Sequence, residues 1–129
     1  MAAVLGRINP HLYVPTRSLA GEAVIFRGNE AKVAEPAQGI IRRMLACGER
    51  CQIIEFRLKK GARIPSHKHP HEQIGFLEKG RFKIVIGDKE YVVGEGDGYW
   101  VEPNVEHVVE VLEDSIAIDV FSPPREDFK

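Results

Sequence analysis

The sequence predicts an all-β domain of mostly antiparallel strands, closed into a two-sheet jelly roll or a small barrel. Three observations support this prediction. From Ile40 onward, short runs rich in β-branched and aromatic residues alternate with turn residues at close intervals. No long stretch repeats its apolar residues with the period of an amphipathic helix. Roughly eight short strands in one domain must also cover their edges and bury one face each, which a closed barrel achieves.

The expected strands follow one another between residues 40 and 121. Glu78-Lys79-Gly80 and Gly87-Asp88-Lys89 separate apolar runs and contain residues that tolerate positive φ, so each predicts a hairpin turn. Pro123 and Pro124 end the β pattern because proline cannot continue a central strand. The predicted strands are Ile40–Ala46, Gln52–Lys59, Gln73–Glu78, Arg81–Ile86, Glu90–Val93, Gly98–Val101, Glu106–Leu112 and Ser115–Phe121.

We divide the chain into an N-terminal arm, residues 1–35, and a barrel domain, residues 36–129. The segments SLAGEAVIF and EAKVAE in the arm fit a strand, a short helix or a packed arm. We expect the arm to cover the domain or a partner subunit. A chain of 129 residues suits a single compact domain with one core.

The charge balance and the apolar runs exclude two classes of partner. Lys and Arg number 18 against 19 Asp and Glu, so no field that would attract nucleic acid is expected. The start lacks a charged segment followed by a long apolar run, and nowhere do about eighteen apolar residues follow one another. We therefore expect a soluble cytoplasmic protein without membrane contact.

Two cysteines, Cys47 and Cys51, flank the residues GER. Their spacing does not match a paired zinc knuckle, and no second pair exists to complete one. If Gly48, Glu49 and Arg50 form a hairpin loop, the two thiols would face each other, and a local disulfide would be sterically allowed. The alternative, favoured for a cytosolic protein, is two small apolar residues.

The stretch HKHPHEQ gathers donor side chains that suit a metal ion. His67, His69, His71 and Gln73 occupy alternate positions, so in an extended strand they share one face. Pro70 disturbs that pattern by bending or unpairing the segment. Histidines along a solvated edge are the alternative to a metal site.

A second element, GDGYWVEPNVEH, supplies another histidine. His107 follows Pro103 by four residues and is the only histidine after His71. Divalent transition metals favour imidazole nitrogen, and histidines from two hairpins can complete a coordination sphere that one short segment cannot. We therefore expect one divalent transition metal ion as cofactor, with zinc, nickel, iron and manganese all open.

These residues resemble the two motifs of the cupin family. Gly61, His67, His69, Gln73 and Gly80 have the spacing of the first motif, in which glutamate is usual where this chain has Gln73. Gly96, Pro103 and His107 resemble the second motif, although Asn104 or Val105 replaces its usual glycine. The resemblance implies a cupin-type double-stranded β-helix. It also implies four metal ligands, with His71 beside the ligands or at the entrance; the ligands are His67, His69, Gln73 and His107.

The glutamine has a chemical consequence for such a site. A glutamate ligand would neutralise one charge of a divalent ion, whereas the carbonyl oxygen of Gln73 brings no charge. We expect weaker metal binding but a stronger Lewis acid, which lowers the pKa of bound water or a substrate hydroxyl further. The neutral ligand also argues against chemistry that requires a ferric ion.

Two polar residues near the C-terminus are further candidates. Asp119 shares a strand face with Phe121, and a carboxylate facing the barrel interior would have a shifted pKa suited to proton transfer. If that face looks outward, Asp119 is ordinary surface. Arg125 could hold a substrate carboxylate at the barrel mouth with its guanidinium fork, or simply be solvated.

From about Gly39 to Phe128, the chain resembles the small single-domain cupins of the pectin degradation protein family, of the KdgF type. HPHEQIGF, EPNVEH and LEDSIAIDVFSPPREDF carry the resemblance. It implies ring opening of 4,5-unsaturated monouronates to linear keto-deoxyuronates at a site with three histidines and a glutamine. It also assigns proton transfer to Asp119, packing against the sugar ring to Phe121 and binding of the substrate carboxylate to Arg125.

Three other functions are alternatives at this stage: a metal-dependent dioxygenase, another non-redox isomerase or cyclase, and a non-catalytic binding module. The fold alone does not choose among them. The expected partner is a small molecule, a carboxylated sugar in the leading hypothesis. We also expect a homodimer, because an exposed β edge left unpaired invites aggregation.

Overall fold

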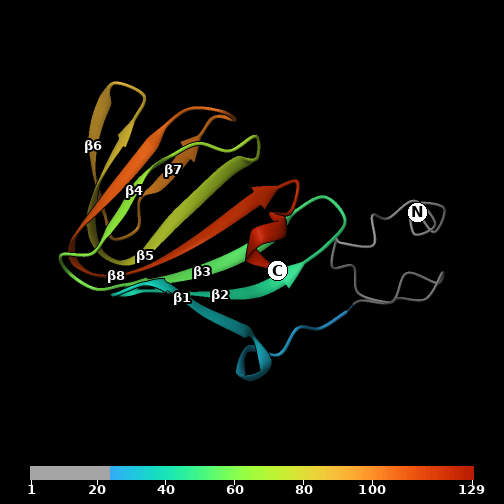
Figure 1. The fold of residues 1–129 in the computed structure, drawn as a ribbon. Coiled ribbons are helices and arrows are strands. Elements are labelled where there is room, and N and C mark those ends of the chain that lie inside the picture. Colours follow the sequence, from blue (N-terminus) through green and yellow to red (C-terminus); the bar gives the residue numbers. More distant parts are fainter. Residues whose placement is uncertain (1–23) are drawn as a thin grey trace.

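The computed structural model describes residues 24–129, which form one antiparallel sheet of eight strands with two short 3-10 turns (Figure 1). In chain order the elements are η2 (Gly28–Glu30), β1 (Lys32–Ala37), β2 (Ile40–Cys47), β3 (Gln52–Leu58), β4 (Arg63–His67), β5 (Glu72–Ile86), β6 (Lys89–Gly94), β7 (Gly98–Val101), β8 (His107–Ser122) and η3 (Glu126–Phe128).

The two longest strands, β5 and β8, organise the fold. They pair with each other from Glu72↔Ser122 to Ile86↔His107. On the other side of β8, β4 pairs with its first half and β3 with its second half. On the other side of β5, β7 pairs with its first half and β6 with its second half.

Both long strands bend near their middles, so that their halves lie in two layers that meet at one end (Figure 1). The buried apolar side chains lie between these layers, as expected for a sheet folded onto itself. The all-β jelly roll predicted from the sequence is thus observed. The largest fully buried apolar side chains are Phe121, Ile54, Leu77, Ile84 and Val101.

One predicted hairpin is wrong. Glu78-Lys79-Gly80 does not reverse the chain; it lies inside β5, where the register with β8 shifts between Leu77 and Phe82. Gly80 has φ 97°, and a Cβ there would lie 2.3 Å from Ser115 Oγ. The glycine therefore serves a bulge where β8 approaches closely, and not a turn.

β8 is continuous opposite this bulge, where the sequence predicted two strands. Glu106–Leu112 and Ser115–Phe121 were expected as two strands, but they form one strand across Glu113 and Asp114. Gly87-Asp88-Lys89 is a correctly predicted hairpin, in which Ile86 pairs with Lys89. A local turn signal does not distinguish a bulge from a hairpin, because both need a residue with positive φ.

Two strands are missing from the predicted set: β4, and β1, for which a strand was one of the three alternatives left open for EAKVAE. β1 is mostly exposed, so it lacks the apolar alternation that marks a buried strand. β4 contains Pro65 and is also largely exposed, which argues locally against a strand. Of the expected N-terminal arm, residues 24–35 contribute η2 and most of β1, and the rest lies outside the described residues.

The hairpin between β2 and β3 does not place the two thiols opposite each other. Cys47 pairs with Gln52, and Cys51 lies in the loop, which a hydrogen bond from Gly48 N–H to the Cys51 carbonyl closes at 2.8 Å. Cys47 is buried and Cys51 is exposed. The possibility that the two thiols face each other across the loop is therefore wrong. Separately, none of the helices among residues 24–129 is long and apolar enough to cross a membrane.

The bulge in β5 generates a stability prediction. Gly80 and Gly61 both have positive φ, at 97° and 88°, but only Gly80 meets neighbouring atoms where a Cβ would stand. Gly61→Ala should cost about 1–2 kcal/mol from backbone strain alone. Gly80→Ala should cost at least about twice that, because the Ser115 backbone must also move. Urea unfolding of both variants measures the difference, and equal losses would contradict the bulge as described.

Candidate metal centre

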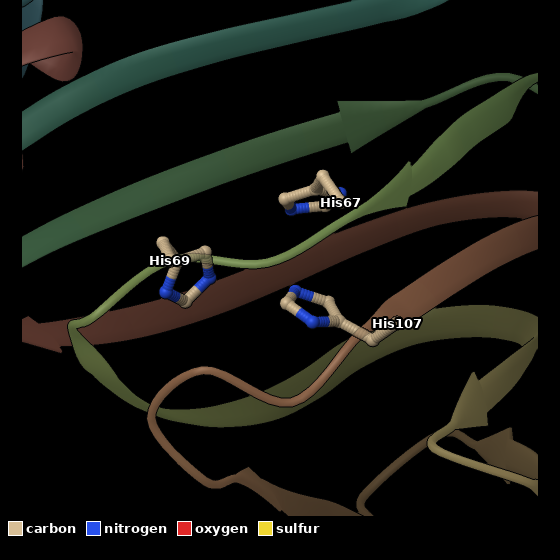
Figure 2. A group of neighbouring side chains, drawn as sticks. All are labelled: His67, His69 and His107. Carbon is tan, nitrogen blue, oxygen red and sulfur yellow. The ribbon is translucent and has the colours of Figure 1, made fainter.

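Three histidines from two parts of the sequence lie together at one end of the β layers (Figure 2). His67 ends β4 and is the register partner of His107, which begins β8. His69 follows in the loop after β4. The ring centroids of His67 and His107 are 4.2 Å apart, those of His69 and His107 are 5.0 Å apart, and one ligand atom of each ring lies within 4.8 Å of the others.

Each of the three rings is held in the same way. Its Nδ1 lies within hydrogen-bond distance of a backbone carbonyl, which can only accept. The Nδ1 atom therefore carries the proton, and the Nε2 atom keeps a bare lone pair, the arrangement that metal-binding histidines adopt. The accepting carbonyls belong to Pro65, His71 and Val105, at 2.9, 3.0 and 2.9 Å.

Gln73 is the second residue of β5, and its buried side chain places an oxygen beside the three histidines. Its Oε1 lies 3.1 Å from His69 Nε2, and its Nε2 donates to Asp119 Oδ2 at 2.9 Å. Because the ring proton of His69 lies on Nδ1, its Nε2 has only a lone pair. This lone pair faces a lone pair of Gln73 Oε1 across 3.1 Å. Such a contact is repulsive unless a cation lies between the atoms.

A second observation also fits a cation. His107 Nε2 is buried and has no hydrogen-bond partner, which is costly for a polar atom. Three imidazole nitrogens and an amide oxygen form a donor set suited to a divalent transition metal. The histidine cluster of the described residues is therefore a candidate divalent-metal site.

Burial keeps two of these rings, those of His69 and His107, ready to bind a cation. It lowers the pKa of His107 to about 4; the hydrogen bond to Val105 opposes this, and the neighbouring rings of His67 and His69 add to it. Burial also lowers the pKa of His69, with Arg125 contributing. Both rings are therefore neutral at pH 7, as metal binding requires.

Asp119 points into the barrel, so the alternative of a surface aspartate is wrong. It is 4% exposed, accepts from Gln73 Nε2 on one oxygen and from the Tyr99 hydroxyl on the other. Burial raises the pKa of Asp119 to about 6, and these two hydrogen bonds oppose the rise. Burial and the nearby Asp119 raise the pKa of Tyr99 well above its usual value, so Tyr99 remains a donor.

Phe121 lies beside the cluster and Arg125 at its rim. The Phe121 ring packs edge-on against His69 with centroids 5.7 Å apart. The Arg125 guanidinium lies 3.9 Å from the Phe128 ring centroid and pairs with both carboxylate oxygens of Asp127, at 3.2 and 2.9 Å. Its side chain is 11% exposed, so Arg125 is not a freely solvated arginine.

One cavity joins these groups. It has a volume of about 70 Å³, and its lining includes His67, His107, Gln73, Asp119, Phe121 and Arg125. Three of the four predicted ligands and the predicted tail residues thus line one space, and His69 adjoins it through its ring contacts with His107 and Phe121. His71 takes the role of a neighbour, because its carbonyl accepts from His69 Nδ1 while its own ring packs 5.5 Å from that of His69.

Sequence reasoning missed three residues at this site. Tyr99 binds Asp119, and Phe128 closes the cavity by packing on Phe121 and Phe56. Buried Gln52 accepts from the Arg125 backbone N–H at 2.9 Å and donates to its carbonyl at 3.4 Å. Only Tyr99 had a usable signal, since it alternates with Val101 on the inward face of a short strand.

This geometry agrees with the comparisons at the level of the family. The family model described as the cupin domain matches residues 54–121, which is more than half of the chain and includes every candidate ligand. The chain therefore belongs to the cupin family.

Among the relatives, the chain is 34% identical over 105 residues to the pectin degradation protein KdgF of Dickeya dadantii, which covers 80% of this chain and 96% of that protein. The structure of KdgF from a Halomonas species matches with a TM-score of 0.76 and 28% identity over 82% of this chain and all of that one. An RmlC-like cupin from Shewanella frigidimarina matches with a TM-score of 0.77 and 29% identity, over 84% and 97% of the two chains.

The histidine cluster predicts a metal-binding experiment. His107→Ala should weaken binding of Zn²⁺ or Ni²⁺ by more than about a hundredfold, because it removes a buried donor and not merely an outer partner. His71→Ala is the matched control: it leaves the carbonyl that holds His69 in place and should bind one ion per chain as the native protein does. Titration calorimetry of metal-stripped protein measures both. Equal affinities of the two variants would show that the cluster does not hold the ion.

Proposed function

We propose that this cupin is a metal-dependent, non-redox enzyme that opens the ring of 4,5-unsaturated monouronates to linear keto-deoxyuronates. The observation that carries the proposal is one cavity that joins two histidines of the cluster, His67 and His107, with Asp119 and Arg125. The similarity to a pectin degradation protein over most of the chain supports the substrate class. No organic cofactor is needed for this reaction.

His67, His69, His107 and Gln73 would hold one divalent ion, with zinc, nickel, iron and manganese all compatible with the donor set. When bound, the ion supplies Lewis-acid polarisation of substrate oxygens. The neutral amide of Gln73 leaves more of the ionic charge available than a carboxylate ligand would.

Asp119 would move the proton in hydration or tautomerisation. Its carboxylate lines the cavity, within the region that a substrate bound beside the histidines would occupy. The donors Tyr99 and Gln73 hold its two oxygens, so that the carboxylate keeps one orientation. A fixed orientation lowers the cost of bringing the carboxylate to the reacting atoms.

Arg125 would bind the uronate carboxylate. Its guanidinium already pairs with both carboxylate oxygens of Asp127 in the geometry that a substrate carboxylate would use. Phe121 would pack against the sugar ring and exclude water.

The cavity also constrains how substrate enters. About 70 Å³ is well below the roughly 300 Å³ of small ligand pockets, so a sugar acid requires the rim to shift. Arg125 and Phe128 form that rim on the C-terminal side. We propose that binding of the substrate carboxylate to Arg125 is accompanied by movement of Phe128 away from Phe121.

A homodimer and a cytoplasmic location stay predictions. Among the described strands, β1 and β6 lie at the two ends of the sheet order, and an unpaired edge favours association. Light scattering at micromolar concentration should give twice the mass of the 129-residue chain, and a monomer at that concentration would contradict this expectation.

The ring-opening activity predicts a direct assay. The metal-loaded protein should speed the loss of ultraviolet absorbance of a 4,5-unsaturated monouronate, equally with and without oxygen. Asp119→Asn should lower kcat by about 10²–10⁴-fold through loss of proton transfer. Arg125→Ala should mainly raise KM, by about tenfold or more, through loss of a bidentate ion pair.

Arg81→Ala is the matched control for Arg125, since the Arg81 side chain lies at the surface in an exposed ion pair with Glu113, at 3.2 Å. It should leave both kinetic constants unchanged. Metal content is measured for every variant, so that loss of the ion is not mistaken for loss of proton transfer. A native protein that adds nothing to the spontaneous rate would exclude this substrate, and a requirement for oxygen would favour a dioxygenase.

A further inference from the structure

We propose that Tyr99 is a positioning residue of the metal site, which acts through Asp119 to fix the orientation of the Gln73 amide. The proposal rests on the metal-binding part of the proposed function and not on the substrate. It means that the metal site requires two features besides its ligands: the hydroxyl of Tyr99, and a glycine at position 75.

Tyr99, Gly75 and Asp119 lie side by side on three neighbouring strands. Gly75 in β5 is the register partner of Tyr99 in β7 and of Asp119 in β8. The side chains of Tyr99 and Asp119 therefore approach each other across Gly75, from strands that are not themselves paired. The Tyr99 hydroxyl donates to Asp119 Oδ1.

Gly75 is required for that approach. A Cβ at Gly75 would lie 2.2 Å from Asp119 Oδ1 and 2.2 Å from Tyr99 Cε1. Any side chain would separate the hydroxyl from the carboxylate. Because Gly75 has no side chain, Tyr99 of β7 and Asp119 of β8 can make a hydrogen bond across β5.

The bond between Tyr99 and Asp119 affects the metal site because the Gln73 amide has a donor NH₂ group at one end and an acceptor oxygen at the other. Gln73 is buried at 8% exposure, and its Nε2 donates to the second oxygen of Asp119 at 2.9 Å. This leaves the carbonyl Oε1 facing His69 Nε2. If the amide turned round, its NH₂ group would face the histidines and its oxygen would face Asp119, so the oxygen ligand would be lost.

Tyr99 selects between these orientations through Asp119. Its hydroxyl holds Oδ1 and thereby aims Oδ2 at the Gln73 amide nitrogen. Without the hydroxyl, the carboxylate is free to rotate and no longer fixes the amide. Partners of this kind, which hold a ligand without contacting the ion, commonly change metal affinity by about 10–100-fold.

Metal titration without substrate tests the proposal. Co²⁺ binding to metal-stripped protein is followed by calorimetry and by its visible absorption spectrum, which reports the ligand geometry. Tyr99→Phe should weaken Co²⁺ binding by about tenfold or more and change the spectrum. The control Tyr91→Phe, at an exposed tyrosine of β6, should do neither.

A double-mutant cycle identifies the route of the effect. Asp119→Leu should weaken Co²⁺ binding at least as much as Tyr99→Phe, and the double variant should be no weaker than Asp119→Leu alone. Asp119→Asn, whose amide oxygen can still accept from Gln73, should lose less than Asp119→Leu. If Tyr99→Phe does not fold, the Co²⁺ affinities at position 119 still test whether Asp119 orients the Gln73 amide. They should decrease from the native protein to Asp119→Asn and then to Asp119→Leu.

Two results would overturn the proposal. One is native Co²⁺ affinity and spectrum in Tyr99→Phe. The other is full additivity of the Tyr99 and Asp119 losses, which would mean that Tyr99 does not act through Asp119. Because no substrate is present, either result leaves the ring-opening proposal standing, and failure of the uronate assay leaves this one standing.

Discussion

The site depends on three hydrogen bonds in which a histidine Nδ1 faces a backbone carbonyl. These bonds place the proton of each ring on the outer nitrogen and turn the inner lone pair of His67, His69 and His107 toward a shared space. Burial then keeps the rings of His69 and His107 uncharged at neutral pH by lowering their pKa, most strongly for His107. The resulting group of lone pairs suits a bound cation, and the glutamine, aspartate and arginine of the cavity lie around it.

The fold supplies this arrangement through the pairing of its two long strands. β8 brings His107 at one end and Asp119 and Phe121 at the other, and β5 brings Gln73 beside them. β4 and β7 then complete the site from outside the central pair, with His67 and Tyr99. Gln73 and Asp119, 46 positions apart in the sequence, become neighbours through this pairing. His107 joins them because both strands bend and fold onto themselves, so the bend at Gly80 is a condition for the site as well as for the core.

The sequence predicted the fold class and the histidine cluster because both leave local signals. Alternating apolar residues mark the strands, and the spacing of His67, His69 and Gln73 marks the motif. It did not predict the continuity of β5 and β8, since Gly80 has the same backbone requirement in a bulge as in a turn. Gln52 and Phe128 were missed because their roles arise from contacts around the C-terminal turn, which no spacing in the sequence records. The alternation of Tyr99 with Val101 marked an inward face, but its bond to Asp119 crosses strands and left no local signal.

X-ray absorption spectroscopy of the zinc-loaded or nickel-loaded protein tests the central claim most directly, because it counts the imidazoles around the ion. We expect one ion per chain, with scattering from three imidazole rings and at least one oxygen in the inner shell. Retention of no ion after exposure to either metal, or an inner shell with fewer than three imidazoles, would contradict it.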